Sequence, residues 1–250
     1  MVILFALIVM RMSGAIAFNP VLGRTGIPAM VKSALILVIS LMLFISTGGA
    51  LSHEPSTLIE FGVMLMKELL FGFTMGFGME LTHMVVRFAA SIMDHSMGLT
   101  MAQVYDPQSN SQVSITSGLF HTFMVLLFFV TDGHVRLIGI FIRSSLLIPF
   151  GAVAVRPELA QAVLEVFQEC IVMGLQFAFP LMAMELVVEA AVGIMMRIIP
   201  QINVFAVNFQ VKILAGLLMI LLLFHPMTDK IYMVMDYMYR IMEDLMTLMR

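Results

Sequence analysis

The segment RIIPQINVFAVNFQVKILAG, residues 197–216, decides the fold class, because it is apolar enough to enter a membrane and still carries several polar side chains. Those inside the segment are Gln201, Asn203, Asn208, Gln210 and Lys212. A charged side chain at the middle of a bilayer costs about 2.5–3.5 kcal/mol on insertion scales. Such groups are kept where protein or water supplies a partner. The segment therefore predicts a membrane helix whose polar groups meet other protein.

The whole chain has the composition of this segment. Its 250 residues are 61% hydrophobic and 12% charged, with a mean hydropathy of +1.04. A soluble domain is about 45–50% apolar and about 25% charged. We therefore expect an all-α, multi-pass protein of the lipid bilayer. A net charge of −3 does not favour nucleic acid as a partner, and the single Cys170 is expected to be a buried thiol.

Apolar windows predict the helices. They cover residues 1–18, 31–50, 58–97, 113–130, 137–150, 159–182, 183–199 and 204–224. The first resembles a signal-peptide core, but no basic residue precedes it, so we expect a retained helix. The region 58–97 is longer than the ~20 residues that span a bilayer core, so it must tilt, kink or project. The polar stretch DPQSNSQVS, residues 106–114, is expected to be a loop.

The last segment, residues 225–250, has the pattern of an amphipathic helix. Its polar residues share one helical face, and they are Asp229, Asp236, Arg240, Glu243 and Thr247. The opposite face is apolar and holds Ile231, Val234, Met238, Ile241, Leu245 and Met249. We expect this helix to lie on a membrane or a partner rather than to span. The alternative is a terminal helix at the surface of the chain.

Charged residues recur inside the apolar windows, and we expect them to make intramembrane polar contacts. The set is Glu68, Glu80, Arg87, Glu185, Glu189, Arg197 and Lys212. Residues 185, 189, 193 and 197 lie four apart and so form one stripe. Since Pro200 disfavours helix at the residue before it, an antiparallel hairpin should turn at 200–203. This register predicts a Glu189–Lys212 ion pair or a shared polar track. The alternative is that different neighbouring subunits satisfy each charge.

The chain has glycines spaced for a close helix contact and lacks the common catalytic motifs. Gly72, Gly76 and Gly78 permit close approach of another helix backbone, with one small-xxx-small spacing. The six histidines are scattered, and the chain has neither H-E-x-x-H nor G-x-S-x-G. We therefore expect no enzyme activity, no metal and no cofactor.

Four sequence blocks follow one another along nearly the whole chain. The first, RMSGAIAFNPVLGRTGIPAMVK, begins at Arg11; the second combines Glu68-LLFGFTMGF with MGLTMAQVYDPQS; the third is TDGH at 131–134. The fourth is the opening segment, with the signature residues Pro200, Gln201, Asn203, Phe205 and Gly216. In these blocks the chain resembles the FliR family of flagellar export-gate subunits and its type III secretion counterparts. It departs from the family at Val211, near which a proline is common.

The resemblance implies a fold, partners and a role. It implies one FliR-like domain with a P-like part at 1–158, a Q-like hairpin at 159–224 and the amphipathic helix at 225–250. FliP-like and FliQ-like subunits and an FlhB-like switch protein would be the partners, and unfolded export substrates would pass through the pore. The resemblance places such a subunit in the bacterial inner membrane, at the flagellar basal body. It implies a pore plug formed by Gln103, Asp106, Pro107, Gln108, Ser109 and Val113. The alternatives are an injectisome export subunit, a secondary transporter and a purely structural subunit.

Overall fold

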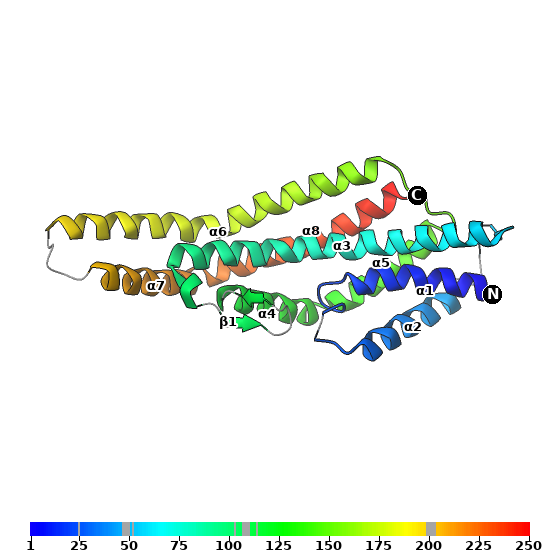
Figure 1. Cartoon of the computed structure of the whole chain (residues 1–250), viewed down its shortest axis with the longest axis horizontal. Helices are drawn as coiled ribbons and strands as arrows, with labels where there is room; N and C mark the ends of the chain where they lie inside the picture. The colour runs from blue at the N-terminus through cyan, green and yellow to red at the C-terminus, as the bar shows by residue number, and fades with distance from the viewer. Residues whose placement is uncertain are drawn as a thin grey trace. The chain divides into compact units, whose positions relative to one another are not determined.

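The structure is a computed structural model that describes residues 1–24, 26–46, 51, 53–102, 104–106, 111–113, 115–198 and 204–250, with the backbone alone at 101–102, 104–106, 111–113 and 204–206. The order of elements is α1 (Val2–Ala17), α2 (Ala29–Ser46), α3 (Leu58–Met97), the short 3₁₀ helix η1 (Leu99–Ala102), β1 (Val104–Asp106), β2 (Ser111–Val113), α4 (Ile115–Val130), α5 (Gly133–Leu147), α6 (Glu158–Ile198), α7 (Val204–Leu222) and α8 (Phe224–Leu248). Figure 1 labels most of them. The described chain is thus almost entirely helical, as the composition predicts.

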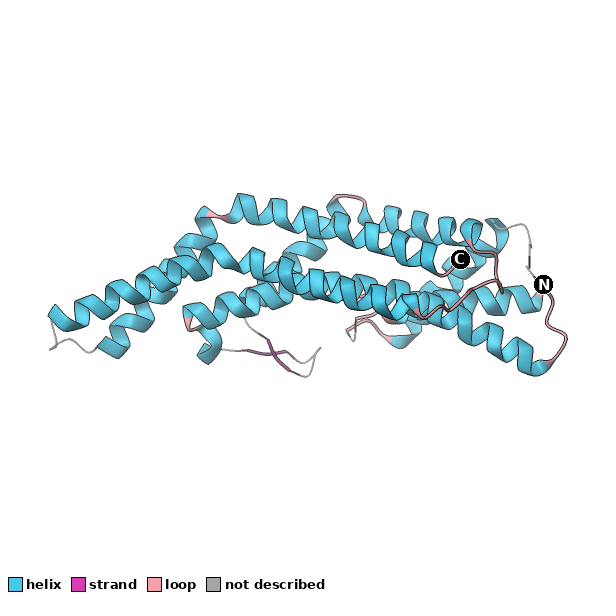
Figure 2. Ribbon diagram, turned by 90° about the horizontal axis from the view of Figure 1, so that it is seen from above, coloured by secondary structure: helices cyan, strands magenta, loops and turns pink. Residues whose placement is uncertain are grey.

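Two expectations about local structure need correction. Residues 159–182 and 183–199 are not separate helices, because α6 continues through both windows with Pro180 inside it. No turn residue interrupts the chain at 182–183, and proline is tolerated in membrane helices because neighbouring groups satisfy the freed carbonyl. Part of the stretch expected as a loop is strand, since β1 pairs antiparallel with β2 and Tyr105 faces Gln112. Figure 2 shows this small ribbon beside the helices.

The described helices include candidates for membrane spans. By length and composition α2 and α6 can each cross a bilayer, with mean hydropathies of 2.3 and 1.9. Two bent pairs pass the same test together: α4 with α5 at 69°, and residues 207–222 of α7 with α8 at 67°. The described part of the chain therefore offers two spans, or up to four if each bent pair is one span.

The chain divides into two compact units. Unit 1 comprises Met1–His83, Leu127–Gln168 and Met235–Arg250, and unit 2 comprises Met84–Leu126 and Glu169–Val234. The family-based division at 158 and 224 is a different kind of boundary and stays a prediction.

Unit 1 is built on close contact between α1 and α3. A Cβ atom at Gly72 would overlap the carbonyl oxygen of Arg11, and one at Gly76 would lie 2.8 Å from the carbonyl oxygen of Ala15. The small-xxx-small spacing therefore lets two backbones touch, as predicted. Gly78 lies against a different helix, α8, because its Cβ position is 3.2 Å from the side chain of Leu245.

The packing of α8 corrects a third expectation. Each residue of its predicted apolar face is 3% exposed or less, so this face is buried within the chain and does not lie on a membrane surface or a foreign partner. Its polar face instead meets α5, where Arg136 pairs with Asp236 at 3.2 Å and Arg143 with Glu243 at 3.0 Å. The two pairs are seven residues apart on both helices, so α5 and α8 run parallel where they touch.

Unit 2 packs α3, α4, α6 and α7 around aromatic and methionine side chains. The rings of Phe120 and Phe177 meet edge to face at 5.6 Å. Gly174 of α6 admits α3 closely, because its Cβ position lies 3.3 Å from the carbonyl oxygen of Val85. Cys170 is buried, as predicted, and forms no disulfide.

Candidate functional site

Unit 1 contains a fully buried ion pair. Arg11 Nε of α1 donates to Glu68 Oε2 of α3 at 2.6 Å, and Arg11 Nη2 donates to Glu68 Oε1 at 3.1 Å. Both side chains are 0% exposed. This bidentate geometry is the strong form of an arginine–carboxylate pair, and it joins two helices that touch at Gly72.

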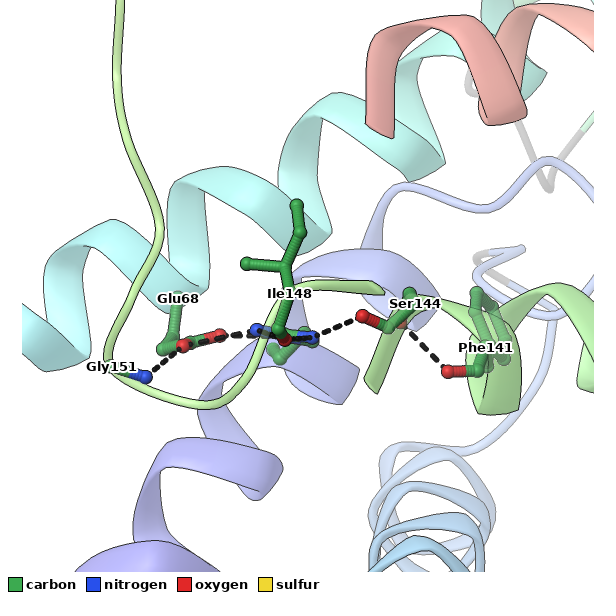
Figure 3. A network of polar contacts seen from close by, with 6 residues as sticks. Glu68, Phe141, Ser144, Ile148 and Gly151 are labelled. Atoms are coloured by element: carbon green, nitrogen blue, oxygen red, sulfur yellow. Dashed lines mark hydrogen bonds and ion pairs between the residues drawn. The ribbon is translucent and has the colours of Figure 1, made fainter. Parts of the chain in front are cut away.

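Backbone groups complete this Arg11 cluster, which comprises Arg11, Glu68, Ser144, Ile148 and Gly151. Arg11 also donates to the carbonyl oxygens of Ser144 at 3.3 Å and Ile148 at 3.2 Å, while Gly151 N–H donates to Glu68 Oε1 at 2.8 Å (Figure 3). The two carbonyls lie at the C-terminal end of α5, where a cation is favourable. The cluster therefore ties α1, α3 and the end of α5 together.

Aromatic rings close the Arg11 cluster on two sides. The guanidinium carbon of Arg11 lies 4.5 Å from the ring centroid of Phe71 and 4.3 Å from that of Phe150. Cation–π contacts of this kind gain strength where water is excluded. The buried charge thus has hydrogen-bond partners and two aromatic rings around it.

A second cluster, the hairpin cluster, lies in unit 2 and comprises Glu185 and Glu189 of α6 with Lys212 and Gly216 of α7. Lys212 Nζ lies 3.3 Å from Glu189 Oε1, so the ion pair predicted from the hairpin register is present. The side chain of Lys212 is 16% exposed and that of Glu189 is 59% exposed. The turn itself, residues 199–203, lies outside the described residues.

Glu185 is the unsatisfied member of the hairpin cluster. It is 3% exposed, and neither carboxylate oxygen has a hydrogen-bond partner among the described residues. A Cβ atom at Gly216 would lie 3.0 Å from Glu185 Oε1 and would overlap the sulfur of Met97. Glycine at 216 therefore leaves space for the carboxylate and for Met97. The oxygen of the Asn208 side chain, on the same face of α7, also has no hydrogen-bond partner in the described part of the chain.

The other predicted intramembrane charges are Glu80, Arg87 and Arg197. Glu80 and Arg87 are half-buried on α3, and both have interaction partners. Arg197 is exposed in the last turn of α6.

The predicted plug and signature residues are described only in part. Asp106 lies in β1, Val113 in β2 and Phe205 in the first turn of α7, each with its backbone alone described. Gln103, Pro107, Gln108, Ser109, Pro200, Gln201 and Asn203 lie outside the described residues. The role predicted for these residues stays a prediction.

Sequence reasoning missed Asp94, a fully buried aspartate near the end of α3. Its Oδ2 accepts a hydrogen bond from Thr116 N–H at 3.2 Å, at the first turn of α4. A carboxylate here satisfies a free N–H and complements the helix dipole. This contact joins α3 and α4, the two helices on either side of the segment that contains β1 and β2. No local sequence motif predicts this contact, because Asp94 and Thr116 come together only in the folded chain.

The described side chains offer no group of three or more His, Cys, Asp or Glu residues that could hold a metal ion. What they do offer is charge pairing inside apolar helices. Such an arrangement fixes helices to one another.

Residues 2–238 match the family described as bacterial export proteins, family 1, and the chain therefore belongs to this family. It is 26% identical to the flagellar biosynthetic protein FliR of Pectobacterium carotovorum subsp. carotovorum, over 83% of this chain and 79% of that protein. It is 28% identical to the FliR protein of Bacillus subtilis strain 168, over 87% and 84%. It is 22% identical to the surface presentation of antigens protein SpaR of Shigella sonnei, over 84% and 80%.

These matches confirm the resemblance to the FliR family that the four sequence blocks indicate. They support a subunit of a type III export apparatus as the broad class of function.

Proposed function

We propose that this chain is a core subunit of the flagellar type III export gate. It would help to form and plug the pore through which unfolded flagellar proteins leave the cell. Its place would be the bacterial inner membrane at the flagellar basal body. The observation that carries this proposal is the family match over residues 2–238, together with relatives named for flagellar biosynthesis.

The exposed faces of the helices support a role as one subunit among several. On α6, Leu186, Val187 and Ile194 are 63–68% exposed, on a helix that also carries the exposed carboxylate of Glu189. A purely lipid-facing helix would avoid this charge. A neighbouring subunit can cover the apolar residues and pair with the carboxylate. FliP-like and FliQ-like subunits and an FlhB-like switch protein are the proposed neighbours.

The segment between α3 and α4 is the proposed plug. The Asp94–Thr116 hydrogen bond joins the helices on its two sides. Gly98, at its start, has a φ of 78°, a conformation that glycine adopts without strain. A segment with fixed ends can occupy a lumen at rest and move aside without unfolding the helices around it.

Copurification tests the proposed assembly. The chain, carrying an affinity tag, is expressed with and without the P-like, Q-like and FlhB-like proteins of its own organism. We expect one complex of defined stoichiometry when all are present, and a chain that is not monodisperse when it is alone. A lone chain that is monodisperse and transports solutes by itself would overturn the proposal in favour of a secondary transporter.

An injectisome export subunit is the second candidate, and the SpaR relative favours it. Complementation separates the two. The gene is introduced into a strain that lacks its own flagellar R subunit and into one that lacks its injectisome counterpart. We expect motility to return in the first strain and secretion to stay absent in the second; the reverse result would identify an injectisome subunit.

A further inference from the structure

Lys212 of α7 pairs with one of two neighbouring carboxylates of α6. Glu185 and Glu189 are one turn apart on the same face of α6, and Lys212 Nζ contacts Glu189. Because Glu185 faces Gly216, one turn beyond Lys212 on α7, the flexible lysine side chain can serve either carboxylate.

The lysine pairs with the more exposed carboxylate. The Glu189 side chain is 59% exposed, whereas Glu185 is 3% exposed and has no hydrogen-bond partner among the described residues. An unpaired charge is far more costly when it is buried than when it is exposed. The pairing therefore leaves the buried carboxylate, that of Glu185, without a hydrogen-bonded cation among the described residues. A second cation, placed on Glu189 from outside, would free Lys212 for Glu185.

The surroundings of Glu189 define what that second cation must be. Leu186 and Val187, close to it along α6, are 65% and 68% exposed, and α6 is a candidate membrane span. A free metal ion or a soluble peptide would not cover these apolar side chains. A helix that presents an arginine or a lysine inside an apolar face would cover them and neutralise the carboxylate.

We propose that Glu189 binds an arginine or lysine side chain from an apolar helix of a neighbouring subunit, and that Lys212 then moves from Glu189 to Glu185. One ion pair breaks and two form, so assembly satisfies the buried carboxylate inside this chain. This inference rests on the proposed function, because it requires the chain to be part of an assembly. Gly216 contributes by keeping a side chain away from Glu185.

Zero-length cross-linking of the unmodified protein tests the exchange. A carbodiimide joins a lysine to a carboxylate in contact with it, and mass spectrometry of the peptides identifies the bond. The isolated chain in detergent should give the Lys212–Glu189 link. The complex with P-like and Q-like subunits should give Lys212–Glu185 instead, with the first link reduced about tenfold. Equal Lys212–Glu189 links in both states, or a complex in which Lys212 links to neither carboxylate, would overturn the inference.

Reciprocal charge exchange gives an independent test. Glu185→Lys, Glu189→Lys and Lys212→Glu should each lower recovery of the complex about tenfold, because each leaves like charges together. Glu185→Lys combined with Lys212→Glu should restore recovery, whereas Glu189→Lys combined with Lys212→Glu should not. The opposite pattern, or rescue by neither combination, contradicts the inference.

A control separates this inference from the proposed function. Glu165 is an exposed carboxylate on the same helix, and Glu165→Gln should leave recovery unchanged. If Glu189→Gln also assembles normally and Lys212 stays linked to Glu189 in the wild-type complex, the exchange is refuted and the export-gate proposal stands. If the wild-type chain recovers no partner, the proposed function itself fails.

Discussion

At the scale of single residues, the main feature of unit 1 is one buried charge with several partners. The five N–H groups of an arginine are matched here by contacts to Glu68, Ser144 and Ile148. A buried pair of this kind contributes little compared with well-packed apolar residues, but losing one partner is costly. The arrangement therefore predicts a large penalty for changing Arg11 alone.

Arg11→Met should destabilise the protein by about 3–5 kcal/mol, because it leaves Glu68 charged and unpaired in the interior. Arg143→Met is the matched control, since its partner Glu243 and Arg143 itself are 42% and 63% exposed. The control should cost about 0–1 kcal/mol. Unfolding titrations in detergent, followed by helical circular dichroism, measure both. Similar losses for the two variants would show that burial does not set the strength of the Arg11 pair.

At the scale of elements, glycine and methionine positions decide how the helices meet. Helices α1 and α3 meet through their backbones, whereas α8 makes its contacts through a continuous buried apolar face. The two contacts should therefore respond to different substitutions, the first to an added methyl group and the second to a lost side chain.

Gly72→Ala should destabilise unit 1 by about 1–3 kcal/mol, because the new Cβ overlaps the carbonyl oxygen of Arg11 and forces α1 away from α3. Gly62→Ala, on the same helix, has open space around its Cβ position. That control should be neutral or stabilising by up to about 1 kcal/mol, from helix propensity alone. Thermal unfolding of the two purified variants gives the comparison, and a neutral Gly72→Ala would mean that the helices do not touch there.

Met238→Ala should cost about 2–5 kcal/mol, because Met238 is 0% exposed on the buried face of α8. Met233→Ala is the control, since Met233 is 52% exposed on the same helix. It should change stability by no more than about 0.5 kcal/mol. The measurement is again unfolding in detergent. Small, equal effects would instead fit a helix whose apolar face lies on the membrane surface.

At the scale of the whole molecule, the proposed role as a pore subunit depends on the segment between α3 and α4. The hydrogen bond between Thr116 N–H and Asp94 joins the flanking helices and involves no residue of this segment. Removing the segment should therefore open a path without dismantling unit 2.

Deleting residues 106–114 should make cells leak small ions through the assembled gate, because nothing else is proposed to fill the lumen at rest. Replacing the same residues by a Gly-Ser segment of equal length tests whether chain length alone is enough. Ion flux across the membrane and copurification of the complex are measured together. Unchanged permeability with an intact complex would show that the segment is only a surface connection.

Several features of this protein could be predicted from the sequence because their causes are local. The apolar window at residues 58–97 predicted α3, and the spacing of charges on either side of Pro200 placed Lys212 beside Glu189. A helical hairpin has little freedom in register, so positions at similar distances from its turn become neighbours in space. The continuation of α6 through residues 182–183 was missed, because an apolar run that ends near a proline does not reveal whether the helix stops.

The sequence by itself determined the membrane class, most of the helices and the hairpin pair, since these depend on composition and on contacts between adjacent elements. Only the tertiary structure decided that Arg11 meets Glu68, 57 residues away, and the end of α5, more than 130 residues away. It alone showed that Asp94 caps α4 and that Glu185 is left without a hydrogen-bond partner among the described residues. The physical reason is that a buried charge needs a partner at hydrogen-bonding distance, and which group comes that close depends on how distant helices pack.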